Sequence, residues 1–137
     1  MIITNSDGGA RGNPGPGAIG IIVRDDNRIM IKYSRKIGNY VTNNIAEYEA
    51  IIMALELAKK LTKDLTCYLD SELVVNQLLG KYRVKDSKLM PLFLRVQKLQ
   101  ENFTSVKYFH VPRDDKFQSM ADEMVNLELD DKMRFCS

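Results

Sequence analysis

The strongest constraint on the fold is a glycine- and proline-rich segment near the start of the chain, residues 6–20, which reads SDGGARGNPGPGAIG. It contains six of the eight glycines and two of the four prolines in the sequence. Glycine has no side chain to pack and loses more conformational entropy on folding than any other residue, so a cluster indicates that something must approach the backbone closely. Asp7 stands at the beginning of this segment. We therefore expect a functional surface of bare backbone beginning at that carboxylate.

The length and composition predict one globular α/β domain. At 137 residues the chain can bury a sizeable core, and we assign residues 1–130 to the domain and residues 131–137 to a loosely ordered tail. No run approaches the roughly 18 apolar residues that a membrane span requires. The first residues, MIITNSDGG, lack the basic and apolar regions of a signal peptide. We expect a cytoplasmic protein with no membrane partner.

The two cysteines, Cys67 and Cys136, match neither a metal-ligand spacing nor a disulfide framework. We expect both to be free thiols. A bridge between them is the alternative.

Positive charge gathers in residues 81–98, KYRVKDSKLMPLFLRVQK, although the formal net charge of the chain is only +2. This segment has six lysines and arginines against one aspartate. A solvated helix face is the ordinary explanation of such a run, and a strip that binds a polyanion is the alternative. The four basic residues that best fit the second reading are Lys81, Arg83, Lys85 and Lys88.

The first part of the chain reads as an antiparallel meander. Strands are predicted at residues 1–7, 18–26 and 28–38, where β-branched residues are frequent, with a turn at residues 25–27 between the second and third.

The remainder alternates helix and strand. Helical periodicity predicts a helix at 45–61, then a short apolar strand at 64–70. Ser71 and Gly80 are a natural start and stop for the next helix. The order β-β-β-α-β-α-α-β-α predicts a mixed five-stranded sheet covered by helices. The last three elements are expected at residues 87–102 (helix, with Pro91 in its first turns), 105–111 (strand) and 119–130 (helix).

Four acidic residues fall where elements of this fold begin or end. Asn44 and Glu47 have the spacing of a capping box, yet residue 47 shares a helical face with Ile51, which must point into the core. Asp122 lies three residues after Ser119, the predicted start of the last helix, and it too shares a helical face with apolar residues. A buried acid requires a partner, and a cation is one.

The other two acids belong to strands. Asp70 ends an apolar strand, at the edge of the sheet where sites in α/β proteins commonly lie. Each of them also has an ordinary structural explanation. Asp70 could be an acid in the first turn of the next helix, and Asp7 could be a simple turn residue.

Four converging carboxylates would raise one another's pKa values, and divalent cations remove that cost. Oxygen ligands without clustered histidine or cysteine favour Mg²⁺, with Mn²⁺ as a substitute. A pair of such ions about 4 Å apart suits in-line phosphoryl displacement.

Four segments together resemble the type 1 ribonuclease H family over nearly the whole chain. They are DGGARGNPGPGAIG, TNNIAEYEAIIMALELA, YLDSELVVNQLLGKYRVK and FHVPRDDKFQSMADEMVN, in the order of that family. The resemblance implies the ribonuclease H fold and an endonuclease, expected to be a monomer, that cuts the RNA strand of RNA·DNA hybrids. The products would carry 5′-phosphate and 3′-hydroxyl ends.

The resemblance also implies roles for individual residues. Asp7, Glu47, Asp70 and Asp122 would be the catalytic and metal-binding acids, holding two ions that activate water and stabilise the departing 3′ oxygen. Bare backbone would let amide and carbonyl groups reach the 2′-hydroxyls of RNA. The implied substrate-binding residues are Gly8, Gly9, Ala10, Arg11, Gly12, Asn13, Thr42, Asn43, Asn44, Glu72, Asn76 and Gln118.

The sequence departs from the family pattern in four respects. Glu72 stands where glutamine is frequent, and Gln118 stands where asparagine is favoured. His110, the single histidine, is a candidate for the histidine that helps product leave, or else an ordinary strand-end residue. The basic protrusion of some family members is missing, so the four basic residues named above are candidates to grip the DNA strand.

A non-catalytic hybrid-binding module on the same fold is the main alternative to an enzyme. It predicts the loss of at least one acid, and all four are present. A related nuclease would place its acids differently, and a purely structural domain would leave the glycine cluster unexplained.

Overall fold

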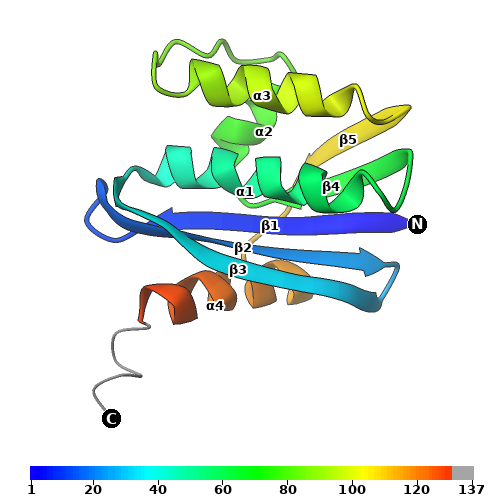
Figure 1. Ribbon diagram of the computed structural model, residues 1–137, viewed down its shortest axis with the longest axis horizontal. Coiled ribbons are helices and arrows are strands. Elements are labelled where there is room, and N and C mark those ends of the chain that lie inside the picture. The colour runs from blue at the N-terminus through cyan, green and yellow to red at the C-terminus, as the bar shows by residue number, and fades with distance from the viewer. Residues whose placement is uncertain (131–137) are drawn as a thin grey trace.

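The computed structural model describes residues 1–130, whose strands form one five-stranded sheet in the order β3-β2-β1-β4-β5 (Figure 1). β1 (Ile2–Ala10), β2 (Gly15–Asp25) and β3 (Arg28–Val41) form an antiparallel meander. β4 (Asp64–Leu69) runs parallel to β1, and β5 (Ser105–His110) runs parallel to β4. The predicted mixed sheet and element order are therefore confirmed.

The helices cover both faces of the sheet (Figure 1). α1 (Asn43–Ala58) packs on β1 and β2, with α2 (Glu72–Leu78) and α3 (Met90–Gln100) on the same side. α4 (Lys116–Leu129) packs on β2, β1 and β3 from the other side. Among the described residues, no helix is long and apolar enough to span a membrane.

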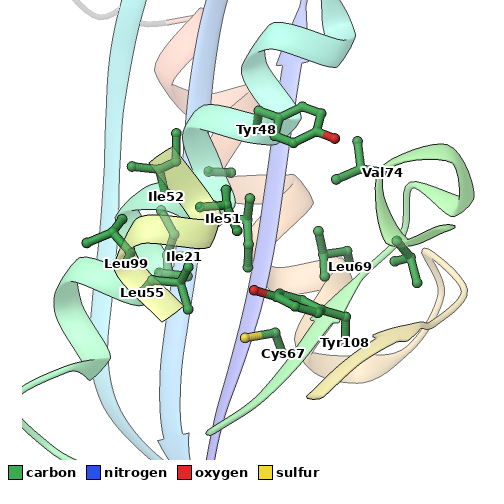
Figure 2. Packing of buried hydrophobic residues seen from close by; sticks show 14 of the residues in the cluster. Ile21, Tyr48, Ile51, Ile52, Leu55, Cys67, Leu69, Val74, Leu99 and Tyr108 are labelled. Carbon is green, nitrogen blue, oxygen red and sulfur yellow. The ribbon is translucent and has the colours of Figure 1, made fainter. Parts of the chain in front are cut away.

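The main core lies between α1 and the sheet (Figure 2). Ile51 and Leu55 of α1 are fully buried, and Leu99 of α3 belongs to the same cluster. Because the sheet covers α1 on one side and α3 covers it on another, residues around most of its circumference are buried. The Tyr48 hydroxyl donates to Gln77 Oε1 of α2 at 2.7 Å. These contacts fix the position of the helix that carries Glu47.

Most of the glycine-rich segment is strand, which the sequence did not predict. β1 continues past Asp7 to Ala10, and β2 begins at Gly15. The glycines allow helices to lie close to the sheet on both faces. A Cβ at Gly8 would lie 2.2 Å from the Ala46 carbonyl oxygen of α1. A Cβ at Gly20 would lie 2.6 Å from the carbonyl oxygen of Ala121 in α4.

Two helices begin elsewhere than the sequence predicted. Thr42, rather than Asn44, caps α1, and its hydroxyl accepts from the Ile45 N–H at 3.2 Å. The capping box with Glu47 is therefore wrong. α4 begins at Lys116 instead of 119, because the Asp115 carboxylate accepts from two N–H groups of its first turn. Asp122 thus lies inside the helix.

Other local predictions agree with the structure. The Ser71 hydroxyl accepts from the Val74 N–H and caps α2, and Gly80 follows that helix with a φ of +80°. Cys67 is a buried thiol. The predicted tail and Cys136 lie outside the described residues.

Candidate active site

Asp7 and Asp70 come from neighbouring parallel strands. Ser6 of β1 is in register with Leu69 of β4, so the residue that follows each of them lies at the same edge of the sheet. Asp7 is only 4% exposed, and the side chain of Asp70 is 7% exposed. The topology therefore brings together two buried carboxylates 63 positions apart in the sequence.

Glu47 completes this group from the first turns of α1. Its Oε1 accepts from the Gly8 N–H at 2.8 Å, which joins the helix to β1 beside Asp7. Its Oε2 is buried and has no hydrogen-bond partner among the described residues. An unpartnered buried carboxylate oxygen is costly, so this atom indicates a missing ligand.

Carboxylate oxygens of Asp7, Glu47 and Asp70 all lie within 4.8 Å of one another. Burial raises the pKa of Asp7, and the charges of Glu47 and Asp70 raise it further. The pKa of Glu47 is raised by burial and by the charge of Asp70. The group therefore resists full ionisation unless a cation compensates it.

The fourth predicted acid, Asp122, lines the same hollow of about 410 Å³ from α4. Its charge contributes to the raised pKa of Asp7. Its carboxylate does not belong to the group within 4.8 Å. The structure therefore brings three predicted acids into close contact and leaves the fourth beside them.

Arg113 is a site residue that the sequence analysis did not identify. It follows β5 in the connection to α4, and its Nε donates to Asp70 Oδ2 at 3.1 Å. The same nitrogen is 4.0 Å from Asp122 Oδ1. Its side chain remains 72% exposed. The sequence did offer a signal for Arg113: it is a basic residue just after a strand that ends at the same sheet edge as the acids.

The bare backbone and asparagines predicted to meet substrate form one wall of this region. The Ala10 N–H donates to Asn43 Oδ1 at 2.9 Å, and the Asn43 N–H donates to Asn13 Oδ1 at 2.8 Å. These bonds tie the turn after β1 to the start of α1. A neighbouring hollow of about 310 Å³ is lined by Asn13, Thr42, Asn43, Asn44 and Asp86. The predicted residues that line the acidic hollow are Gly8, Gly9, Ala10, Arg11, Asn43 and Asn44.

Arg11 and Gly12, also predicted to meet substrate, lie in the turn between β1 and β2. Arg11 forms an ion pair with Asp130 at the end of α4. Gly12 has a φ of +91°, a backbone conformation that favours glycine. It does not line the described hollows that are lined by Arg11 or Asn13.

Gln118 does not face substrate, contrary to prediction. It is fully buried, and its Oε1 accepts from Asn5 Nδ2 at 3.1 Å while its Nε2 donates to the Ser6 carbonyl oxygen at 2.7 Å. A residue shielded in this way can act on the site only through β1 and α4.

A separate hollow of about 280 Å³ contains the predicted residues Glu72, Asn76, Lys81 and His110. His110 ends β5, in register with Leu69, and it does not line the acidic hollow.

The basic residues 81–88 belong to the irregular connection between α2 and α3, not to a helix. Buried Val84 and Leu89 hold this connection on the core. The side chains exposed on it include Lys81, Arg83, Lys85 and Lys88.

Comparison with known proteins now identifies the family. A family model described as "Reverse transcriptase-like" matches residues 5–127. The crystal structure of RNase H1 from the halophilic archaeon Halobacterium salinarum superposes with a TM-score of 0.88 and 36% identity, covering 95% of this chain and 98% of that one. The chain belongs to the type 1 ribonuclease H family.

Other members of the ribonuclease H family are equally similar. The N-terminal RNase H domain of Rv2228c from Mycobacterium tuberculosis gives a TM-score of 0.89 at 34% identity, with 99% of this chain and 98% of that one covered. LC11-RNase H1, crystallised with an RNA/DNA hybrid, gives a TM-score of 0.88 at 35% identity. The match covers 97% of this chain and 99% of that one.

Full-length relatives extend beyond the matched region. The bifunctional protein Rv2228c is 36% identical over 132 residues, which are 94% of this chain and 35% of that protein. Ribonuclease HI of Halobacterium salinarum is 39% identical over 127 residues, which are 91% of this chain and 62% of the relative. The chain thus spans about a third of the mycobacterial protein.

Proposed function

We propose that the protein hydrolyses the RNA strand of RNA·DNA hybrids and leaves 5′-phosphate and 3′-hydroxyl ends. The observation that carries this proposal is the group of three buried carboxylates within 4.8 Å, one of which has an unpartnered oxygen. Membership of the ribonuclease H family and the hybrid bound to LC11-RNase H1 support it.

The donor set fits two magnesium or manganese ions. All the candidate ligands are carboxylate oxygens, which Mg²⁺ and Mn²⁺ prefer, and the buried Glu47 Oε2 is available to accept a cation. Asp7, Glu47 and Asp70 would form the centre of the site, with Asp122 as the fourth ligand. When bound, such ions lower the pKa of an attacking water and stabilise the leaving oxygen.

The chain's own residues would orient the hybrid. Residues 8–10 line the hollow with little side chain, so RNA could approach their backbone and place there the 2′-hydroxyls that distinguish it from DNA, although the Gly8 and Ala10 N–H groups already donate to Glu47 and Asn43. Asn13 and Asn43, already joined by a hydrogen bond, offer amide groups to the two strands. The exposed basic connection between α2 and α3 would hold the DNA phosphates.

A cleavage assay with matched variants tests the proposal. Hybrid, duplex RNA and duplex DNA, each labelled on one strand, are incubated with the protein in Mg²⁺, in Mn²⁺ and in EDTA. We expect cleavage of only the RNA strand of the hybrid, and only with metal. Asp70→Asn should lower the rate roughly 10³-fold or more. Asp64→Asn, at the far end of β4, is the matched control and should retain the rate.

Each other outcome has a defined meaning. Tight hybrid binding without cleavage in either metal would replace the proposal with the non-catalytic binding module. Equal cleavage by the Asp70→Asn and wild-type proteins, with contamination excluded, would remove Asp70 from the catalytic group.

A further inference from the structure

A buried polar relay joins β2, β1 and α4 directly behind the acidic group. Arg24 Nε donates to Asn5 Oδ1 at 2.9 Å, and Asn5 Nδ2 donates to Gln118 Oε1 at 3.1 Å. Gln118 Nε2 then donates to the Ser6 carbonyl oxygen at 2.7 Å. Arg24 is 6% exposed, and the two amide side chains are fully buried. Burial of this kind makes each bond costly to lose.

All the hydrogen bonds of the relay are donated in the same direction, from Arg24 towards the Ser6 carbonyl, because the relay begins at an arginine. A guanidinium only donates, so Asn5 must present its carbonyl oxygen to Arg24 and its amino group to Gln118. Gln118 must in turn present its amino group to the Ser6 carbonyl. The guanidinium carbon of Arg24 lies over two aromatic rings, 4.1 Å from the centroid of Phe117 and 5.7 Å from that of Tyr68. Arg24 at one end of the relay and the Ser6 carbonyl oxygen at the other therefore fix the orientation of both amides.

Each amide of the relay lies on the same side of its element as one of the acids. Asn5 and Asp7 are two residues apart on a strand, so their side chains leave the same face of the sheet. Gln118 and Asp122 are four residues apart on a helix, so they lie on the same face, one turn apart. The Asn5–Gln118 bond therefore lies next to the place where Asp7 and Asp122 approach each other.

We propose that this relay positions α4 against β1 and so determines the affinity of the acidic group for divalent cations. Asp122 is the acid outside the close group, and the register of α4 sets how far its carboxylate lies from Asp7. Gln118 is thus a positioning residue that acts through Asp122 and the Ser6–Asp7 backbone. The inference rests on the proposed metal site, although its test measures metal binding and not cleavage.

Titration calorimetry with MnCl₂ tests the relay, using the metal-free chain of 137 residues. Gln118→Leu removes both of its hydrogen bonds at similar volume, and we expect about tenfold weaker Mn²⁺ binding, the usual scale for groups that orient metal ligands. Gln118→Asn keeps an amide with shorter reach and should give an intermediate value. Val96→Ala, a truncation of a fully buried residue in α3, controls for reduced stability. It should lower the urea midpoint and leave the affinity within about twofold.

The outcomes separate the relay from the metal site itself. If wild-type protein binds Mn²⁺ and Gln118→Leu binds it equally well, the positioning role is wrong and the proposed function stands. If Val96→Ala weakens binding as much as Gln118→Leu does, the effect is one of general stability and the inference is also wrong. If wild-type protein binds no Mn²⁺, both proposals fail. Should Gln118→Leu not fold, Arg24→Met, which removes the first donor, carries the same expectation of about tenfold weaker binding.

Discussion

Asp7 is a carboxylate on the central strand of the sheet, almost fully buried and in contact with two other acids. The sequence identifies it because an acid beside a run of glycines has few structural reasons to be there. The sequence identifies Glu47 because it lies on the buried face of a predicted helix, and Asp70 because it ends an apolar strand. It misplaces Gln118, because a glutamine near an active-site acid can point to substrate or into the core, and only packing decides.

The buried acids make the metal-free protein sensitive to pH. A carboxyl group whose pKa is raised on folding contributes stability below its unfolded pKa, about 4, and that contribution is lost as pH rises toward the folded pKa. We therefore expect the free energy of unfolding to fall between pH 5 and pH 8 in EDTA. Asp7→Asn should raise it by roughly 1–3 kcal/mol at pH 8, measured by urea unfolding, because the wild-type protein must keep a proton on Asp7 at a pH where the unfolded chain ionises it, and asparagine carries no such cost.

Saturating Mn²⁺ provides the control for this pH effect. It should stabilise wild-type protein more than Asp7→Asn and so reverse or close the difference at pH 8. An Asp7→Asn protein that is less stable than wild type in EDTA at pH 8 would contradict the raised pKa of Asp7.

Arg113 forms an ion pair with Asp70 and would therefore compete with a metal ion for that carboxylate. It supplies the nearby positive charge in the structure, yet its side chain is mostly exposed, so its ion pairs are worth no more than about 1 kcal/mol. Arg113→Gln should therefore strengthen Mn²⁺ binding by up to about fivefold in calorimetry. Lys116→Gln, three residues further along, is a basic control outside the acidic hollow and should leave the affinity unchanged. Weaker binding by Arg113→Gln would show that the arginine supports the site instead of competing for it.

At the scale of elements, the site depends on how closely α1 approaches β1. Gly8 permits that approach, because its N–H reaches Glu47 while any side chain would collide with the α1 backbone. Glu47 and Asp7 share one hollow as a result.

Two adjacent glycines test this contact. Gly8→Ala should destabilise the protein by about 3 kcal/mol or more, because its Cβ would meet the Ala46 backbone at 2.2 Å. Gly9→Ala meets only Val125 Cγ1 at 3.6 Å, an ordinary contact, and should change stability far less. Urea midpoints of the two variants give the comparison, and similar midpoints would contradict the close packing.

The start of α1 shows why helix ends are hard to predict. Thr42, Asn43 and Asn44 are all good capping residues, so local propensity does not choose among them. The tertiary contact decides: Ala10 and Asn13 hold Asn43 as the first helical residue, so Thr42 before it is the cap and Asn44 lies inside the first turn. The strands, in contrast, were largely predictable because their apolar patterns are strong. The ends that were missed are the glycine-rich ends of β1 and β2 and the last three residues of β3.

Capping variants give a direct check on that assignment. Thr42→Ala should cost about 1 kcal/mol in the free energy of unfolding, since it removes the acceptor of the Ile45 N–H. Asn44→Ala should cost less than about 0.5 kcal/mol, as a substitution away from the cap. Both costs are measured by urea unfolding. A larger loss of stability for Asn44→Ala than for Thr42→Ala would support the capping box of Asn44 and Glu47 instead.

At the scale of the whole molecule, acids from positions 7 to 122 line one hollow because two parallel strands end at one sheet edge and a helix packs on each face. Their convergence was predictable from the element order and the mixed sheet that it implies. Arg113 and the relay were not predictable, because each depends on side-chain contacts between elements distant in the sequence.

The basic connection between α2 and α3 is the part of the molecular surface that we assign to the DNA strand. Replacing Arg83, Lys85 and Lys88 with alanine should weaken hybrid binding and reduce the slope of log affinity against log salt by about 0.9 for each phosphate that the variant no longer neutralises. The matched control replaces Lys59, Lys60 and Lys63, beyond the other end of α1, and should leave the slope unchanged. Equal slopes for the two triple variants would contradict the assignment.

The central claim is that Asp7, Glu47 and Asp70 hold divalent cations. Anomalous diffraction from crystals grown with Mn²⁺ tests it most directly. We predict anomalous peaks within bonding distance of all three carboxylates, with Glu47 Oε2 among the ligands and Arg113 moved away from Asp70. A map with manganese bound only elsewhere, and with the Arg113–Asp70 ion pair intact, would contradict the account.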